Sequence, residues 1–203
     1  MIKIGITGSI AMGKTTIAKV FKILRIPVHN SDTEVKHLLE KNKLVFQKIK
    51  RNWPEAIYKS TIINKEYLRQ IVFSNKTDKL KLEQIIHPLV NKRKKEFELS
   101  YKKKKTMIAF DIPLLYETKQ KDNYDYIFLA VCKESTQLKR ALKRKTLNVE
   151  IFKKIKKSQF TVQQKIKYDP IIINTDYPKL INFVKIMYTV IRIKFGVQAK
   201  NGK

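Results

Sequence analysis

The sequence predicts an α/β fold in which helices pack in layers against a parallel sheet. Short apolar runs that end in polar residues recur along the chain, as expected of parallel strands buried on both faces. Longer stretches with apolar residues at helical spacing lie between these runs. The first run leads through a glycine-containing loop into a helical pattern. At 203 residues, the chain has the length of one compact domain with a small insertion and a substantial core.

The first elements are a strand, a loop and a helix. Strands are expected at residues 2–7 and 27–30, with the first helix between them. Ser31, with Glu34 three residues later, fits a capping box that opens the next helix. The α/β alternation is therefore established early in the chain.

The middle of the chain, from residue 44 to about 100, shows helical patterns without a strong strand signal and is predicted to be a helical insertion. Pro88, after His87, is expected to interrupt a helix there, because proline removes a backbone hydrogen bond. The tail 198–203 is expected to fray. Beyond the insertion, strands are expected at 107–112, 126–131 and 171–174, and helices at 134–145, 149–157 and 179–193.

A phosphate-binding motif follows the first predicted strand. Gly8 to Thr15 read Gly-Ser-Ile-Ala-Met-Gly-Lys-Thr, which fits the pattern G-x-x-x-x-G-K-[ST]. Backbone N–H groups of such a loop and of the helix that it opens point at nucleotide phosphates. Lys14 would bridge the β- and γ-phosphates, and the Thr15 hydroxyl would ligate Mg²⁺. The alternative is an ordinary glycine turn before a helix.

Asp32 is the candidate residue for activating an acceptor. It comes just after the second predicted strand, and ligands of open α/β sheets gather at the carboxyl ends of the strands. A carboxylate there would orient or deprotonate an attacking hydroxyl. The alternative is an Asp favoured in the first helical turn by the helix dipole, with Ser31 as the cap.

Two longer strings are more specific than the phosphate motif. Residues 82–88 read Leu-Glu-Gln-Ile-Ile-His-Pro, and residues 111–117 read Asp-Ile-Pro-Leu-Leu-Tyr-Glu. With the phosphate loop, they resemble successive landmarks of the dephospho-coenzyme A kinase family, over nearly the whole chain. The other landmarks are Thr7-Gly8, Val28 to Asp32, Leu68-Arg69 with Val72-Phe73, Gln137 to Arg140 with Arg144, Gln159, Lys165 with Asp169, and Ile173-Asn174.

The resemblance implies ATP-dependent phosphorylation of the ribose 3′-hydroxyl of 3′-dephospho-coenzyme A, the last step of coenzyme A synthesis. It implies a three-layer P-loop kinase fold with a five-stranded parallel sheet. The core would comprise about 1–32, 106–135 and 168–203, the helical acceptor-binding insertion about 33–105, and a mobile lid about 136–167. The expected cofactors are ATP and Mg²⁺, and the expected substrates are ATP and dephospho-CoA.

Motif and resemblance together nominate the site residues. Asp32, Lys14 and Arg140 are expected to be catalytic, and Thr15 to bind the metal. ATP contacts are expected from Gly8, Ala11, Met12, Gly13, Lys14, Thr15, Thr16, Arg144 and Asn174, and acceptor contacts from Thr7, Asp32, His87, Pro113 and Leu114.

Arg140 and Arg144 lie four residues apart on one predicted helix and share a face. Only seven of the 45 basic residues are Arg, so this pair suggests sites that Lys cannot serve. We expect both to reach the ATP phosphates from the lid. The alternative is a solvated helix face. Asp111 resembles a carboxylate that supports Mg²⁺, and a structural role is its alternative.

Several positions depart from the family pattern. Ser9, Ala11 and Arg25 stand where glycine is usual, which matters wherever the backbone needs a positive φ. Asn30 replaces the first Asp of a D-x-D pair, and Asn64-Lys65 replaces Asp-Arg. Gly13, Lys14, Thr15 and Asp32 remain, so a working kinase is expected, at the usual or a reduced rate.

The formal net charge is +28. Nucleic acid or an anionic membrane would attract such a chain, but Lys lacks the planar fork that suits phosphate and guanine. We interpret the excess as Lys spread over solvent-facing positions, so no nucleic-acid or membrane partner is expected. Two other functions stay open: another small-molecule kinase of this fold, and an RNA-associated P-loop ATPase, although helicase-like motifs are missing.

Cys132, the single cysteine, lies in an apolar run and is expected to be a small buried hydrophobe. No disulfide framework is possible, the three histidines lack metal-ligand spacing, and no apolar run reaches the length of a membrane span. Met1 leads into a strand pattern without a signal peptide. A cytoplasmic chain is expected, as a monomer or a weak homo-oligomer.

Overall fold

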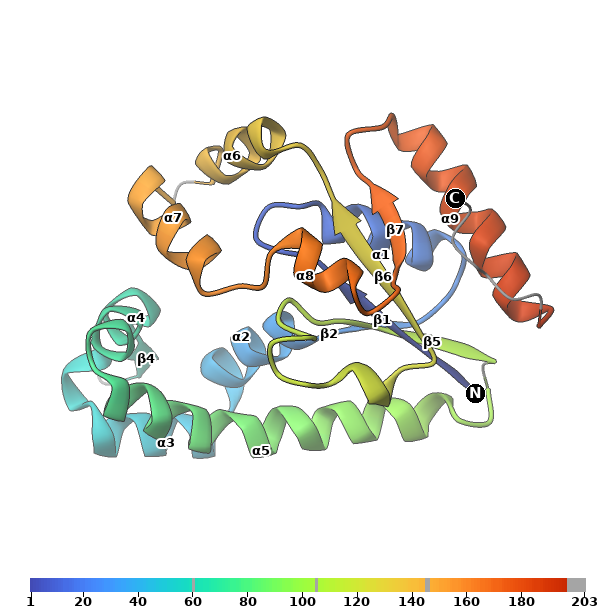
Figure 1. The fold of residues 1–203 in the computed structure, drawn as a ribbon. Coiled ribbons are helices and arrows are strands. Elements are labelled where there is room, and N and C mark those ends of the chain that lie inside the picture. Colours follow the sequence, from blue (N-terminus) through green and yellow to red (C-terminus); the bar gives the residue numbers. More distant parts are fainter. Residues whose placement is uncertain (60, 105, 145–146, 197–203) are drawn as a thin grey trace. The chain divides into compact units, whose positions relative to one another are not determined.

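The computed structural model describes residues 1–59, 61–104, 106–144 and 147–196, and for Phe73 the backbone alone. The chain forms two compact units, one from Met1–His29 with Tyr101–Lys203 and the other from Asn30–Ser100. Figure 1 shows their helices and strands. The helix predicted over 134–145 is too long, because α6 ends at Leu142, so Arg144 lies beyond the helix that carries Arg140 and the two do not share a helix face. Lys145 and the tail 198–203 lie outside the described residues.

A five-stranded parallel sheet in the order β2-β5-β1-β6-β7 forms the core of the fold. In the register, Ile6 of β1 lies beside Asp111 of β5, and Thr7 lies beside Leu129 of β6. The phosphate loop after Thr7 therefore leaves the sheet at the carboxyl ends of the strands, where Asp111 lies. The predicted strands are confirmed to within one residue: β1 (Ile2–Thr7), β2 (Val28–Asn30), β5 (Met107–Asp111), β6 (Tyr126–Val131) and β7 (Ile171–Asn174).

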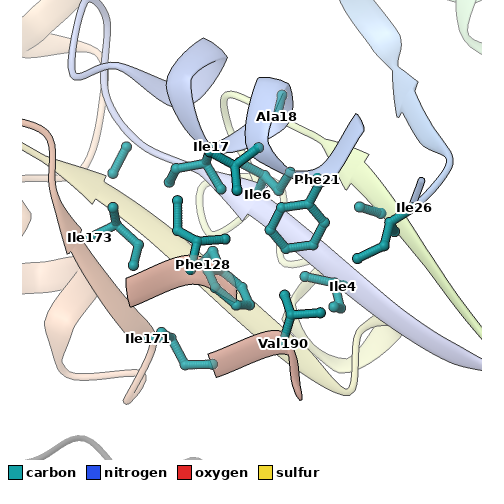
Figure 2. Packing of buried hydrophobic residues seen from close by; sticks show 14 of the residues in the cluster. Ile4, Ile6, Ile17, Ala18, Phe21, Ile26, Phe128, Ile171, Ile173 and Val190 are labelled. Carbon is teal, nitrogen blue, oxygen red and sulfur yellow. The ribbon is translucent and has the colours of Figure 1, made fainter. Parts of the chain in front are cut away.

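Helices α1 (Lys14–Ile23) and α9 (Lys179–Lys194) contribute to one hydrophobic cluster with one face of the sheet. Alternate residues of β1, Ile4 and Ile6, are fully buried in it, and Figure 2 shows their packing with side chains of both helices. Full burial of one such side chain contributes about 1.5–3 kcal/mol. Position 5 faces the opposite side of the sheet, where a Cβ added to Gly5 would lie 2.6 Å from Leu115 Cδ1.

Helix α1 ends in a Schellman motif. The N–H of Ile26 donates to the carbonyl of Phe21 at 2.9 Å, and the N–H of Arg25 donates to that of Lys22 at 3.0 Å. Arg25 has φ 57°, in the left-handed region that glycine adopts most easily. The expectation that Arg25 occupies a glycine position is therefore confirmed.

Replacing Arg25 with glycine is expected to stabilise the protein by about 0.5–1 kcal/mol. The left-handed conformation costs a non-glycine residue about 1–2 kcal/mol, and the greater freedom of glycine in the unfolded chain offsets part of the gain. Urea unfolding of Arg25→Gly measures the change. Lys22→Gly, in the last helical turn, is the control and should destabilise by about 0.5–1 kcal/mol. A loss of stability in Arg25→Gly would contradict the prediction.

The second unit is helical, with a core that includes Leu38, Ile49, Trp53 and Leu68. The Trp53 ring N–H donates to Asp78 Oδ1 at 3.1 Å. Its helices are α2 (Ser31–Lys41), α3 (Lys43–Asn52), α4 (Lys65–Ser74) and α5 (Lys76–Tyr101), with a short 3-10 helix at Pro54–Ala56 and a hairpin of β3 (Ile57–Tyr58) and β4 (Ile62–Ile63). The sequence did not predict the hairpin.

Two predictions about helix boundaries are wrong. The cap of α2 is Asn30, whose Oδ1 accepts from the N–H of Thr33 at 2.8 Å, and Ser31 is the first helical residue. Helix α5 continues through Pro88, because the loss of one backbone bond leaves many helical turns on either side.

Between β6 and β7, the chain forms α6 (Glu134–Leu142), α7 (Val149–Lys157) and the short α8 (Val162–Ile166), in yellow to orange in Figure 1. Helix α7 matches its prediction, whereas α8 was not predicted. Another 3-10 helix, Lys121–Asn123, precedes β6. Among the described residues, no helix has the length and apolar character needed to cross a membrane.

Candidate functional site

The phosphate loop turns sharply into α1 at Gly13. Gly13 has φ 94°, and a Cβ added there would lie 2.7 Å from Thr175 Oγ1, so this position requires glycine. Ala11 has φ 60°, which confirms that it occupies a position where glycine would relieve strain. Ala11 is buried against Ala141 of α6 and Phe152 of α7. Its methyl group therefore packs against α6 and α7.

The first turn of α1 combines backbone N–H groups with a cation. Lys14 is the first helical residue and half-buried, and Thr15 is exposed. The first turn contains no acidic residue, so nothing there opposes the positive end of the helix dipole. This arrangement suits phosphate groups.

Two glutamines hold the peptide groups of Ile10 in the loop. Gln137 Nε2 of α6 donates to the Ile10 carbonyl at 2.8 Å, and the Ile10 N–H donates to Gln159 Oε1 at 2.8 Å. Gln137 is 1% exposed. Both glutamines belong to the landmark strings, although neither was nominated as a site residue. The segment predicted to be a lid, residues 136–167, thus contacts the phosphate loop through these two side chains.

A cavity of about 620 Å³ opens beside the loop, between Ser9, Met12 and residues of α6 and α7. Cys132 lines it and is half-buried, with its Sγ 3.5 Å from Met12 Sδ. The prediction of a buried cysteine is therefore wrong, because Cys132 lies one residue beyond β6. Burial nevertheless raises the pKa of its thiol. Basic side chains of α7 also line this cavity: Lys153, Lys156 and Lys157.

Arg140 is engaged by the loop after β7. Its Nη1 donates to Thr175 Oγ1 and its Nη2 to the Thr175 carbonyl, both at 2.8 Å. Thr175 Oγ1 in turn donates to the Met12 carbonyl of the phosphate loop at 2.8 Å. Arg144 is exposed. The structure thus connects Arg140 to the phosphate loop through Thr175, a residue that the sequence did not nominate.

The carboxyl ends of the strands carry most of the other nominated residues of the first unit. The Thr7 hydroxyl donates to the Pro113 carbonyl at 3.3 Å, and Leu114 next to it is exposed. Asp111 is 6% exposed at the end of β5. Asn174, at the end of β7, accepts from the N–H of Asp176 at 3.0 Å through Oδ1.

Asp32 belongs to the second unit, where it is exposed as the second residue of α2. It lines a cavity of about 510 Å³ whose other charged residues are all cationic: Lys36, Lys65 and Arg69. The apolar part of the lining comes from Val35, Leu39, Leu68, Val72 and Leu82. His87 is exposed on α5 and is not among the lining residues. The landmark Leu68-Arg69 and the departure at Lys65 were the sequence signals for this cavity.

The strand order, the loop conformation and the helix that follows define a P-loop kinase. The family model for dephospho-CoA kinase matches residues 2–178. The chain therefore belongs to the dephospho-CoA kinase family, and its activity is the phosphotransfer of that family from ATP to dephospho-CoA.

Individual proteins agree with this assignment. A dephospho-CoA kinase of Bacillus anthracis is 32% identical over 175 residues, which cover 85% of this chain and 88% of the relative. The structure of dephospho-CoA kinase from Campylobacter jejuni is 25% identical, with a TM-score of 0.70 and 96% and 98% of the two chains covered. A Thermus thermophilus crystal structure, 24% identical over 95% of this chain and 97% of its own, has a TM-score of 0.81 and supports the fold.

Proposed function

We propose that the chain binds the phosphates of ATP on its phosphate loop and transfers the γ-phosphoryl group to the ribose 3′-hydroxyl of dephospho-CoA held beside Asp32. The observation that carries the first half is the loop conformation, with Gly13 at positive φ before the first turn of α1. The nominated ATP contacts are Gly8, Ala11 to Thr16, Arg144 and Asn174.

Magnesium fits the residues present. Mg²⁺ takes one or two protein oxygens and completes its shell with phosphate oxygens and water. The exposed Thr15 hydroxyl, in the first turn of α1, is the ligand that we assign, with Asp111 as a supporting carboxylate. The ion would neutralise charge on the phosphates during transfer.

The cavity beside Asp32 supports the second half of the proposal. Dephospho-CoA carries a diphosphate, and the guanidinium of Arg69 with the ammonium groups of Lys36 and Lys65 suits that group. The apolar lining suits the uncharged parts of the same molecule. Asp32 would then orient the hydroxyl and accept its proton.

The remaining nominated residues have subsidiary roles in this proposal. Thr7, Pro113 and Leu114 lie beyond strands β1 and β5 and would contact the acceptor, as would His87 on α5. Arg140 would leave Thr175 for the transferred phosphoryl group when the lid closes. A cytoplasmic enzyme that works as a monomer or weak homo-oligomer completes the proposal.

The function is tested by measuring ADP formation with dephospho-CoA beside nucleoside monophosphates and shikimate. Of these acceptors, we expect only dephospho-CoA to raise the rate of ADP formation above the acceptor-free background. Arg69→Gln is expected to raise the KM for dephospho-CoA about tenfold or more and to leave the KM for ATP unchanged, because one charged hydrogen-bond donor contributes about 1.5–3 kcal/mol.

Arg93→Gln is the matched control, because Arg93 also pairs with a Glu three residues away on an exposed helix face. It should leave both KM values unchanged. If Arg69→Gln changed both KM values equally, or changed neither, dephospho-CoA would not bind in this cavity. Activity with another acceptor instead would reassign the substrate.

A further inference from the structure

Lys165 is a fully buried cation close to the phosphate loop. Its side chain is 0% exposed, whereas most of the Lys residues in this chain face solvent. A buried ammonium costs several kcal/mol unless it is paired and hydrogen-bonded. Helix α8, which presents Lys165, begins with a capping box formed by Thr161 and Gln164. The position of Lys165 is therefore fixed by its own helix.

The partners of Lys165 form a closed ring of hydrogen bonds. Lys165 Nζ donates to Ser9 Oγ at 3.1 Å and pairs with Glu117 Oε1 at 3.0 Å. Glu117 Oε1 also accepts from the N–H of Phe160 at 2.8 Å. The Ser9 hydroxyl donates to the Phe160 carbonyl at 3.3 Å, which closes the ring. Three separate segments thus meet at the second residue of the phosphate loop.

The ring depends on a side chain that glycine would lack. Ser9 is 5% exposed, and its hydroxyl both accepts from Lys165 and donates to Phe160. The next residue, Ile10, is held through its peptide groups by the two glutamines described above. The first half of the loop is therefore fixed from outside, whereas Gly13 and α1 fix the second half.

The charge of Lys165 reaches the phosphate site. Burial lowers the pKa of Lys165, the hydrogen bond and charge of Glu117 oppose this, and the nearby ammonium of Lys14 lowers the pKa further. Two ammonium groups that repel each other are stabilised together by an anion placed between or beside them. The pairing with Glu117 favours the charged form of Lys165.

We propose that Lys165 is a positioning residue for the ATP phosphates: with Glu117, it holds Ser9 and thereby the phosphate loop in the conformation that accepts them. This inference rests on the proposed function of the loop as the ATP site. Lys165 acts through its hydrogen bond to Ser9 and through its positive charge. Replacing Lys165 therefore weakens nucleotide binding and leaves acceptor binding intact.

The test compares Lys165→Met, which keeps much of the shape and removes the charge, with the control Lys167→Met on the exposed surface two residues later. We expect the KM for ATP and the Kd for ADP measured by calorimetry to rise about tenfold or more in Lys165→Met. The KM for dephospho-CoA should stay within twofold, and Lys167→Met should match the wild type. Unchanged nucleotide affinity in a folded Lys165→Met, or equal rises of both KM values, would overturn the inference.

Ser9→Ala decides the matter if Lys165→Met does not fold. It removes the hydroxyl and leaves the Lys165–Glu117 pair, so the Kd for ADP should rise about threefold to tenfold, and an unchanged Kd would overturn the inference. Glu117→Gln should lower the pKa of Lys165, so that the KM for ATP rises with pH more steeply than in the wild type. Lys14→Met separates the two proposals: nucleotide binding equal to that of the wild type would reject the loop as the ATP site itself.

Discussion

Arg140→Lys is expected to lower kcat about 100-fold with little change in the KM for dephospho-CoA. A guanidinium donates in a planar fork, and in the structure both arms of Arg140 bind Thr175. The same fork fits the oxygens of a phosphoryl group in transfer, and arginines in that role contribute factors of 10³ or more in related chemistry. A lysine supplies one charge without the fork. Steady-state kinetics with saturating ATP measures the effect.

Thr175→Val separates a direct role of Arg140 from a positioning role. Valine keeps the shape and the backbone carbonyl of Thr175, and it removes the hydroxyl that joins Arg140 to Met12. If Arg140 acts on the phosphoryl group, Thr175→Val loses much less activity than Arg140→Lys. Equal losses would show that Arg140 acts through Thr175, and unchanged turnover in Arg140→Lys would reject both roles.

The centre of the sheet was predictable from the sequence because its strands β1, β5 and β6 are largely buried on both faces. In β5 (Met107–Asp111) every residue is buried and the first four are apolar, so only the polar Asp111 at its end marks the edge of the sheet where the site lies. The strands β3 and β4 are two residues each, too short for any alternation to appear. Helix α8 has five residues, little more than one turn, and shows no periodicity.

The candidate site residues were predictable where they are neighbours in the sequence. Gly13, Lys14 and Thr15 are consecutive, so spacing alone identifies them. Gln137 lies 127 positions from the carbonyl that it binds, and Thr175 lies 163 positions from the Met12 carbonyl. Only the fold brings such residues to the loop. Nor does a sequence indicate that a lysine among many is buried, as Lys165 is.

The prediction for Asp32 decides between the two explanations of this residue. If Asp32 accepts the proton of the attacking hydroxyl, Asp32→Asn should lower kcat by about 10²–10⁴-fold, the range of general-base catalysis. The KM for ATP should not change. If Asp32, the second residue of α2, only stabilises the helix through its interaction with the helix dipole, the substitution should cost about 0.3–1 kcal/mol of stability and should not change kcat.

Glu34→Gln provides the matched control, because Glu34 is the other acidic residue in the first turn of α2. It removes the same charge from the same helix end, yet it is not among the lining residues of the cavity that contains Asp32. Both variants should therefore lose similar stability in urea unfolding, and only Asp32→Asn should lose turnover. Equal kcat values for the two variants would assign Asp32 to the helix alone. Because the two variants share the dipole effect, any difference between their kcat values belongs to the chemistry of the carboxylate.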